Sequence, residues 1–594
     1  MLSKLKHILA QYFEVTRIVW HCSKRYTIAR FITIFFAAVL PLGQLFLMKL
    51  VIDELTAEEG FDISNTDQIV TYLIIMGGII LANAATSNIA QYISELQQQQ
   101  VADYMAGILQ KKSLEVDLAL YDDPEYHNSY FLAQRHGLHR PSLLVAGLMD
   151  FLQNTISLLF LGGFVFYLHE FVALLLFVSV IPSAVIKYVM AEKLFNWEKK
   201  RTGMERETVY LNKMVTESTY AKEVRVFDAG LSLSERFQSI KKTLFKEKKG
   251  LNVLRIKMNV GAQTIEIAAE IWSYVFVVYR TINGLITIGE LVIFFQAFQK
   301  GKANLSASLQ AMVKLAEHRL FLSHFLRFIK LEPAMQDNKD SVALNSPIMS
   351  GIELSDVSFK YPKTDSYAVK DISLHLPIGK ITALVGENGS GKSTLVKLIS
   401  RLYDPLEGEI CLDGKRYKAI KLSDLRAKMS ITFQDFCKFY LTIGENISFS
   451  DLDNEANEVL ARKYAQMTGA DEFIAKLPHG YGQRLGRMFD ESTELSLGQW
   501  QKIALARMFF KDAEIIIVDE PTSAIDPIAE HRVFEILKEL SVNRIVLLVT
   551  HRLYNLKIAD HIVVMESGNI VESGSHDDLI DQGNRYYQMF QKQS

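Results

Sequence analysis

The sequence predicts two fold classes in one chain: an α-helical polytopic membrane domain, followed by an α/β domain of the phosphate-loop type. Long apolar stretches with few charges dominate the first part of the chain and predict membrane helices. After Gly351 the pattern changes to short apolar runs separated by Gly and Asp turns, and the Gly-rich motif Gly386–Thr394 follows one of these runs. This change of pattern predicts the α/β domain.

The length of 594 residues exceeds what one hydrophobic core supports, so several domains are expected. We place the membrane domain in residues 1–335, a linker in 336–350 and the α/β domain in 351–594. The net charge of −2 gives no reason to expect a nucleic-acid partner. The three cysteines are far apart and show neither a disulfide framework nor zinc-ligand spacing, which suits a reducing cytosolic face.

Six stretches are candidates for membrane-spanning helices, each of which needs about 20 mostly apolar residues. They lie near Phe31–Ile52, Ile69–Ile93, Leu143–Tyr167, Phe171–Val189, Val260–Tyr279 and Leu285–Met312. A tight turn at His169-Glu170 separates the third stretch from the fourth, and a short turn over Arg280–Gly284 separates the fifth from the sixth.

The distribution of charge predicts how the chain is oriented. Residues 1–30 carry six Lys/Arg against one acidic residue, whereas the loop Asp53–Gln68 carries six acidic residues and no Lys or Arg. The positive-inside rule therefore places the N-terminus in the cytoplasm and that loop outside. The segment Ala191–Lys257, with 16 Lys/Arg against nine acidic residues, also fits the cytoplasm. An even number of spans then returns the chain of this multi-pass protein to the cytoplasm, which places the α/β domain there.

The two long cytoplasmic segments, Glu95–Ser142 and Ala191–Lys257, have more helical pattern than loops should have. We interpret them as continuations of the spanning helices, with each pair joined by a short transverse turn. The candidate turns are His136–Leu143 and Thr219–Phe227. The alternative is a set of unconnected surface helices.

Two carboxylates in the fifth stretch raise a question about cargo. Glu266 and Glu270 are four residues apart and therefore lie on one helix face. A charge at mid-bilayer costs on the order of 2.5–3.5 kcal/mol, so one interpretation is a water-filled cavity that favours cationic cargo. The other is that this part of the helix protrudes into the cytoplasm, where both carboxylates are solvated.

The Gly-rich motif fits the phosphate-loop pattern of a Gly, four residues, then Gly-Lys-Ser. It stands between an apolar run, Ile381–Val385, and a helical run, Leu395–Ile399, which is the context the motif requires. Its backbone N–H groups and the helix N-terminus attract phosphate oxygens, the lysine reaches the terminal phosphates, and the serine ligates magnesium. The alternative is a Gly/Ser-rich turn before an ordinary helix. The motif comprises Gly386, Glu387, Asn388, Gly389, Ser390, Gly391, Lys392, Ser393 and Thr394.

A second motif, Ile515–Glu520, is a run of aliphatic residues that ends in two carboxylates. Such a strand is buried on both faces, and its end lies beside the phosphate loop in a parallel sheet. Asp519 is placed to hold magnesium through water. Glu520 is placed to orient or deprotonate an attacking water.

Between these two motifs lies Leu495-Ser-Leu-Gly-Gln499, which resembles the signature motif of ATP-binding cassette proteins. The resemblance extends through the whole α/β half and implies ATP and Mg²⁺ as the bound groups. It implies that Tyr361 stacks on adenine, although a strand aromatic in a period-two pattern with Phe359 is the alternative. It also implies that Gln434 joins magnesium, the attacking water and the membrane domain, and that His551 contacts the γ-phosphate.

The same resemblance implies further site residues. Ser496, Gly498 and Gln499 would form the signature contact with ATP, and Ser523–Asp526 would signal across a dimer. Ser393, Gln434 and Asp519 would hold magnesium. Leu497 departs from the family's usual Leu-Ser-Gly-Gly-Gln, and its Cβ puts the fit at that helix N-terminus in doubt.

Six spans followed by one cassette resemble the half-transporters of the exporter class. In that family two chains pair, and each ATP lies between the phosphate loop of one and the signature of the other. The resemblance therefore implies a second chain as partner, with a homodimer favoured over a heterodimer with a similar chain. The lipid bilayer is a further partner, and the expected activity is ATP hydrolysis coupled to transport.

The cargo is indicated by two short segments, Tyr121–Asn128 and Leu497–Lys502, which look like those of exporters of lantibiotics and related modified peptides. We expect no cysteine-peptidase domain ahead of the first span. The resemblance implies export of a small peptide from the cytoplasm to the outside. The alternatives are a lipophilic substrate, as in a lipid or multidrug exporter, and a membrane-anchored regulatory ATPase that carries nothing.

Overall fold

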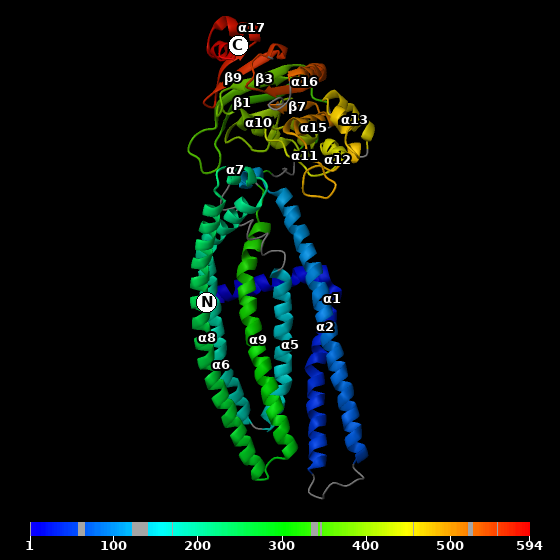
Figure 1. Ribbon diagram of the computed structural model, residues 1–594, viewed down its shortest axis with the longest axis vertical. Helices are drawn as coiled ribbons and strands as arrows, with labels where there is room; N and C mark the ends of the chain where they lie inside the picture. Colours follow the sequence, from blue (N-terminus) through cyan, green and yellow to red (C-terminus); the bar gives the residue numbers. More distant parts are fainter. Residues whose placement is uncertain are drawn as a thin grey trace. The chain divides into compact units, whose positions relative to one another are not determined.

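The computed structural model describes residues 2–56, 66–121, 140–168, 170–333, 335, 342–344, 347–454, 457–520, 527–554 and 556–593 (Figure 1). The chain divides into two compact units. The first comprises Met1–Leu114 and His127–Leu331, and the second comprises Glu115–Tyr126 and Glu332–Ser594.

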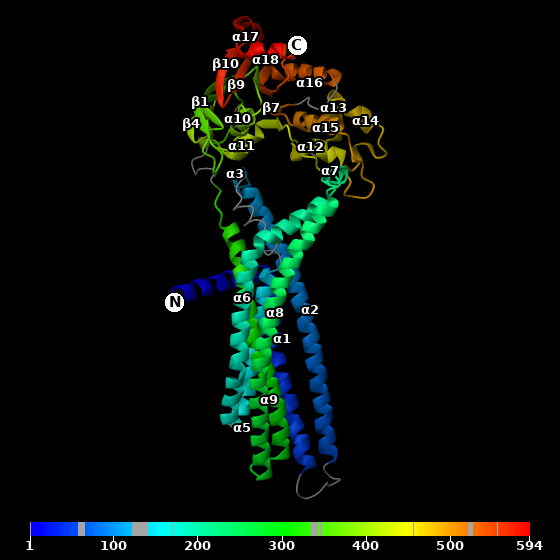
Figure 2. The same cartoon turned by 60° about the vertical axis from the view of Figure 1, so that its left-hand side comes forward.

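The first unit is built from long helices. They are α1 (Leu2–Leu55), α2 (Thr66–Glu115), α5 (Arg140–Leu168), α6 (Glu170–Thr216), α8 (Gly230–Ile282) and α9 (Ile288–Ile329). Helix α5 packs along α9, and α6 packs along α8, as Figure 2 shows. A buried apolar cluster that includes Phe294, Ala297 and Phe298 of α9 holds the centre of this unit together.

Helices of spanning length and composition are found in three of the predicted places. Among the described residues, helices long and apolar enough to cross a membrane lie in Thr16–Leu55, Asp67–Glu115 and Ser142–Leu161. The other three predicted spans lie largely within α6, α8 and α9 and stay predictions.

The connections between helices differ in part from the predicted turns. Arg280, Thr281 and Ile282 are still helical, so the turn before α9 lies three residues later than predicted, at 283–287. Thr287 ends this turn as the N-cap of α9, because the Thr287 hydroxyl accepts the N–H of Glu290 in a capping box. Helix α6 begins at Glu170, and His169 lies outside the described residues.

The long extensions of the helices are confirmed in α2, which runs to Glu115, and in α6 and α8. Helix α6 runs to Thr216, a short helix α7 (Ala221–Val226) follows, and α8 begins at Gly230. The other predicted turn, His136–Leu143, is wrong at its end, because α5 begins at Arg140. Pro141 is tolerated there, since the first helical turn needs no N–H partner. Residues 136–139 lie outside the described part of the chain.

Glu270 is compensated within the membrane unit, and whether the glutamate pair lines a cavity or protrudes into the cytoplasm stays a prediction. Its carboxylate accepts hydrogen bonds from Tyr274 Oη at 2.8 Å and from Gln299 Nε2. It also forms an ion pair with Lys302 Nζ at 2.8 Å, and its side chain is 13% exposed. Glu266, at 9% exposed, is likewise buried. The sequence could not reveal the charge compensation, because Gln299 and Lys302 come from the neighbouring helix α9.

The second unit contains two sheets in the described part of the chain. The antiparallel sheet has the order β2-β1-β4-β5, and the larger sheet has the order β10-β9-β3-β8-β7-β6. Strands β6, β7, β8, β3 and β9 run parallel, and β10 is antiparallel to β9. The strands are β1 (Gly351–Phe359), β2 (Val369–Pro377), β3 (Ile381–Gly386), β4 (Glu407–Leu412), β5 (Lys415–Arg416), β6 (Met429–Thr432), β7 (Ile515–Asp519), β8 (Ile545–Val549), β9 (His561–Glu566) and β10 (Asn569–Gly574).

Strands β3, β7 and β8 are buried along their whole length, because apolar clusters cover both faces of the larger sheet. Successive residues alternate between the faces: Leu384 and Ile517 join one cluster, and Ala383 and Val518 join the other. The helices of this unit are α3 (Leu118–Tyr121), α10 (Lys392–Ile399), α11 (Leu422–Ala427), α12 (Ile443–Ser448), α13 (Glu458–Met467), α14 (Asp471–Ile474), α15 (Leu497–Phe510), α16 (Pro527–Leu540), α17 (His576–Gln582) and α18 (Arg585–Gln591).

Two segments that the sequence assigns elsewhere pack into this second unit. Leu344 and Ile348, placed in the linker by sequence, are 8% and 2% exposed and join the core cluster. Ala119 of α3 packs against the same cluster, and Asp117 Oδ1 accepts the backbone N–H of Met335 at 3.3 Å. Apolar side chains within short polar segments therefore tie both segments to the α/β core.

Candidate nucleotide site

The phosphate loop connects β3 to α10 and keeps its backbone close to neighbouring strands. Gly391 caps α10 with φ of 104°, a left-handed conformation that L side chains rarely adopt. A Cβ at Gly391 would lie 2.7 Å from the carbonyl oxygen of Ala368, so this position requires glycine. The loop thus leaves the N-terminal N–H groups of α10 available to an anion.

Lys392 is buried within this loop, at 7% exposed. Its ammonium donates hydrogen bonds to the carbonyl oxygens of Gly386 at 2.8 Å and Glu387 at 2.9 Å. Burial lowers the pKa of Lys392, and the charges of Glu520 and Asp519 act in the opposite direction. The ammonium is therefore anchored at the loop and electrostatically coupled to the two carboxylates after β7.

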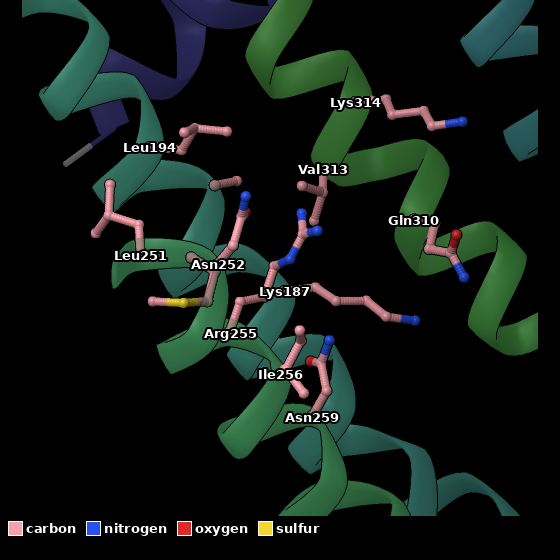
Figure 3. Close-up of a pocket in the computed structure, with 12 residues that line it drawn as sticks. Lys187, Leu194, Leu251, Asn252, Arg255, Ile256, Asn259, Gln310, Val313 and Lys314 are labelled. Carbon is pink, nitrogen blue, oxygen red and sulfur yellow. The ribbon is translucent and has the colours of Figure 1, made fainter. Parts of the chain in front are cut away.

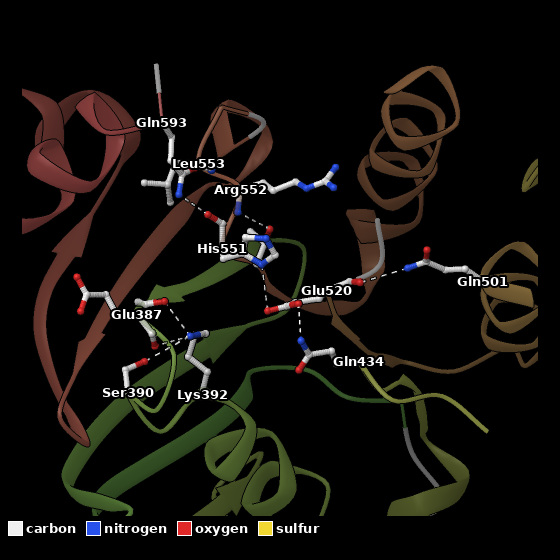
Figure 4. A network of polar contacts seen from close by, with 12 residues as sticks. Glu387, Ser390, Lys392, Gln434, Gln501, Glu520, His551, Arg552, Leu553 and Gln593 are labelled. Atoms are coloured by element: carbon white, nitrogen blue, oxygen red, sulfur yellow. Dashed lines mark hydrogen bonds and ion pairs between the residues drawn. The ribbon is translucent and has the colours of Figure 1, made fainter. Parts of the chain in front are cut away.

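Glu520 stands at the centre of a polar network (Figure 4). Its Oε2 accepts a hydrogen bond from Gln434 Nε2 at 2.7 Å, and its Oε1 lies 3.1 Å from His551 Nδ1. The Glu520 side chain is 9% exposed, whereas that of His551 is 49% exposed. The structure therefore brings together three residues that the sequence places far apart and predicts as catalytic.

The backbone at Glu520 is itself unusual. Its φ is 49°, which is left-handed for a residue with a side chain, and such a conformation costs on the order of 1–3 kcal/mol. The N–H of Glu520 donates to the carbonyl of Val549 at 2.9 Å, which extends the pairing of β7 with β8 by one residue and holds this conformation. Strain maintained in this way fixes the direction of the carboxylate.

Asp519 ends β7 and is 4% exposed. Burial raises its pKa to about 6, with the charge of Glu520 acting in the same direction and that of Lys392 opposing it. A divalent cation nearby would favour the charged form of this carboxylate. Asp519, Ser393 and Gln434 line one cavity of about 720 Å³.

The oxygen donors in this cavity fit magnesium that arrives with a nucleotide. Among the described residues, no group of three His, Cys, Asp or Glu side chains could hold a metal alone. Mg²⁺ is usually bound through one or two carboxylates together with substrate phosphates and water. The side chains present, a carboxylate, a hydroxyl and an amide, match that pattern.

Tyr361 lines the same cavity and lies beyond the end of β1 at Phe359, so the strand-aromatic alternative does not apply. Its hydroxyl is 3.1 Å from Thr394 Oγ1, and its ring packs edge-on against Phe359 and Tyr403. Asn388 and Gly389 also line the cavity. The sequence did not single out four further lining residues, which carry no motif of their own: Tyr367, Ala368, Ser567 and Gly568.

The signature motif begins helix α15. Ser496 is its N-cap, and its Oγ accepts the N–H of Gln499 at 3.3 Å while Gln499 Oε1 accepts the N–H of Ser496 at 2.9 Å. Leu497 is helical and 55% exposed, so its Cβ is compatible with the helical backbone, while its effect on the fit to ATP is not tested. Of the described residues that line the phosphate-loop cavity, none belongs to the signature, including Gly498.

Two predicted segments fall outside the described residues. Ser523–Asp526 is one of them, and the part of Tyr121–Asn128 after Tyr121 is the other.

A contact that the sequence did not reveal holds the loop after β8. Gln593 Nε2 donates to the carbonyl of His551 at 2.7 Å, and its Oε1 accepts the N–H of Leu553 at 2.9 Å. Met589, Lys592 and Gln593 line a second cavity of about 380 Å³ together with Glu520 and His551. The C-terminal segment is far from these motifs in sequence, and a lone Gln gives no pattern to find it by.

Comparisons with known proteins agree with this geometry. Residues 369–523 match the family described as ABC transporter. The nisin transport ATP-binding protein NisT of Lactococcus lactis subsp. lactis is 28% identical over 97% of this chain and 94% of its own length. The ATP-dependent lipid A-core flippase of Photorhabdus laumondii subsp. laumondii is 30% identical over 72% of each chain.

A solved structure, that of a bacterial Atm1-family ABC exporter with ATP bound, matches with a TM-score of 0.85. The two sequences are 21% identical, and the match covers 96% of this chain and 99% of that chain, so the two share a fold. The helical membrane domain followed by a single ATPase domain is the arrangement of a half-transporter. The chain belongs to the ABC transporter family, and its activity is ATP hydrolysis coupled to transport.

Proposed function

We propose that this protein exports a small peptide of the lantibiotic kind across the cytoplasmic membrane. The observation that carries this proposal is similarity along the whole chain, including the membrane half that meets the cargo. The relatives named for nisin and subtilin transport match 97% and 91% of this chain. A multidrug export protein and a lipid A-core flippase match 52% and 72%, which keeps lipid or drug export as the second candidate.

The proposed catalytic roles follow from the positions of the side chains. The phosphate loop and Lys392 bind the phosphates, and Ser393, Asp519 and Gln434 hold Mg²⁺, which would neutralise developing phosphate charge. Glu520 orients the attacking water and accepts its proton, and Gln434 and His551 hold the Glu520 carboxylate in place. Tyr361 stacks on the adenine. The ATPase domain works in the cytoplasm, where ATP is available.

We further propose that the working unit is a homodimer. The signature residues Ser496, Gly498 and Gln499 are absent from the described lining of the phosphate-loop cavity, so one chain offers only part of an ATP site. The capped N-terminus of α15 presents N–H groups suited to phosphate. A second copy would supply these groups to the first, and the first would do the same for the second.

Replacing Glu520 with Gln should leave ATP binding intact and reduce turnover about 10²–10⁴-fold, the usual contribution of a positioned base. Steady-state phosphate release and equilibrium binding of ATP measure the two effects. Near wild-type hydrolysis would remove Glu520 from its role.

Replacing Gln593 with Ala should lower kcat roughly 3- to 10-fold with little change in KM, because two hydrogen bonds of about 1 kcal/mol each no longer hold the His551 loop. The matched control is Gln591→Ala, since the amide of Gln591 contacts only Tyr587 on the same helix in the described structure. An equal effect of both substitutions, or a fall in unfolding temperature that accounts for the loss, would show that Gln593 acts on stability alone.

Composite sites can be tested by mixing Lys392→Ala chains with Ser496→Arg chains. A mixed dimer holds one doubly damaged site and one intact site, whereas each homodimer holds two damaged sites. Activity should return in purified mixed dimers. Mixed dimers as inactive as the parents would contradict sharing of sites between chains, or show that both sites must work.

Export itself is tested with sealed vesicles that carry the protein with its ATPase domain outside. A fluorescent lanthionine-bearing peptide should accumulate inside with ATP and should not accumulate with the Glu520→Gln protein. Labelled lipid and a cationic dye form the comparison arms. Movement of lipid or dye alone would favour the second candidate, and ATP hydrolysis without movement of any of the three would favour a regulatory ATPase.

A further inference from the structure

A cavity of about 380 Å³ lies among helices α6, α8 and α9 of the membrane unit (Figure 3). Its charged lining is entirely basic among the described residues: Lys187 from α6, Arg255 from α8 and Lys314 from α9. Figure 3 shows Lys187 and Arg255 reaching into the space between the ribbons of α8 and α9. Three cations from three helices thus surround one small volume without a lining carboxylate.

Two of these cations, Arg255 and Lys314, are exposed side chains and have no compensating charge within the described structure. Lys187 is partly satisfied, because it donates to Ser306 Oγ at 3.0 Å and interacts with the buried Glu266. No ion pair is formed by Arg255 or Lys314 with any described residue. Glu270, on the same helix as Arg255, differs because it forms an ion pair with Lys302. The excess positive charge is therefore local to the cavity.

The remaining polar groups can complete an anion site. The side-chain amides of Asn252, Asn259 and Gln310 also line the cavity and can donate hydrogen bonds. The Oδ1 atom of Asn259 is buried without a hydrogen-bond partner among the described residues. This orphaned acceptor requires a donor, which water or a head-group hydroxyl can supply and a phosphate oxygen cannot.

The cavity lies at corresponding positions along the three helices. In all three helices it lies near one end of a predicted span: these spans end near Val189 in α6, begin near Val260 in α8, and end near Met312 in α9. Lys187, Arg255 and Lys314 stand within a few residues of these three points. If these predicted spans hold, their coincident ends on packed helices lie at the boundary between hydrocarbon and the head-group layer.

The cavity also has an apolar side, formed by Met190, Leu194, Leu251 and Val313. A free anion gains nothing from these side chains, whereas an amphiphile buries its glycerol and upper acyl carbons against them. Basic pockets between membrane helices bind the head groups of anionic lipids, and a guanidinium can hold a phosphate through two hydrogen bonds.

We infer that this cavity binds the phosphate head group of an anionic phospholipid at the membrane boundary. Arg255 and Lys314 provide the charge, the amides complete the hydrogen bonds, and the apolar side receives the start of the acyl chains. The site is separate from the ATP site and does not depend on the identity of the cargo. Because it touches three helices at once, an occupied site ties α6, α8 and α9 together.

The test is lipid retention by the purified full-length protein in mixed vesicles of phosphatidylcholine and phosphatidylglycerol, measured by native mass spectrometry after extraction. We expect selective retention of phosphatidylglycerol. The double variant Arg255→Gln/Lys314→Gln should lower that selectivity on the order of 30-fold, at about fivefold for each interfacial charge. The matched control is Lys242→Gln/Lys246→Gln, which removes two exposed charges from the extension of α8.

Every outcome of this lipid-retention test either supports or overturns the inference. Equal retention of both lipids by the wild-type protein overturns the inference even if the double variant does not fold. An equal loss of selectivity in the control shows attraction to the surface rather than a site. Displacement of the lipid by inorganic phosphate at equal concentration would assign the cavity to a soluble anion, and displacement by the exported peptide would assign it to cargo. Retention that survives both competitors and falls only in the double variant supports the lipid site.

Discussion

Parallel pairing of β3, β8 and β7 is the constraint on which the rest of the nucleotide site depends. Because these strands run in one direction, their carboxyl ends meet at a single edge of the sheet. The phosphate loop follows β3, Glu520 follows β7 and the loop of His551 follows β8. A slip in the register of β7 against β8 would separate the Glu520 carboxylate from His551, and no local rearrangement of the side chains could restore their 3.1 Å approach.

This arrangement assembles all but one part of an ATP site. The loop, the carboxylates and the histidine meet within one unit, yet the capped end of α15 lies away from the described lining of their cavity. The capping box keeps Ser496 and Gln499 engaged with each other, so that helix end is preformed before it meets a phosphate. Preformed donors reduce the entropy lost when two chains close on a nucleotide. Dependence on a second copy is therefore a consequence of geometry in the proposed homodimer.

The sequence predicted those parts of the site that short motifs encode, and it missed those that depend on packing. The phosphate loop, Asp519, Glu520 and the signature were each found, because their chemistry requires fixed residue types at fixed spacing. Gln593 was missed, since a single amide bonding a distant backbone has no local pattern. Leu344 was assigned to a linker because polar neighbours hide one buried side chain. The start of α5 was missed, since Pro141 is stable both in a turn and in a first helical turn.

Charge compensation in the membrane unit changes what the glutamate pair can mean for cargo. Counted along the sequence, Glu266 and Glu270 form an acidic face that would attract a cation. In the folded unit Lys302 neutralises Glu270 and Lys187 faces Glu266, so little negative charge remains. The uncompensated charge is instead positive and lies at Arg255 and Lys314, close to the membrane boundary. A cationic peptide thus gains little attraction from this face of the unit, and its recognition must rest on apolar contact or on groups that a second chain contributes.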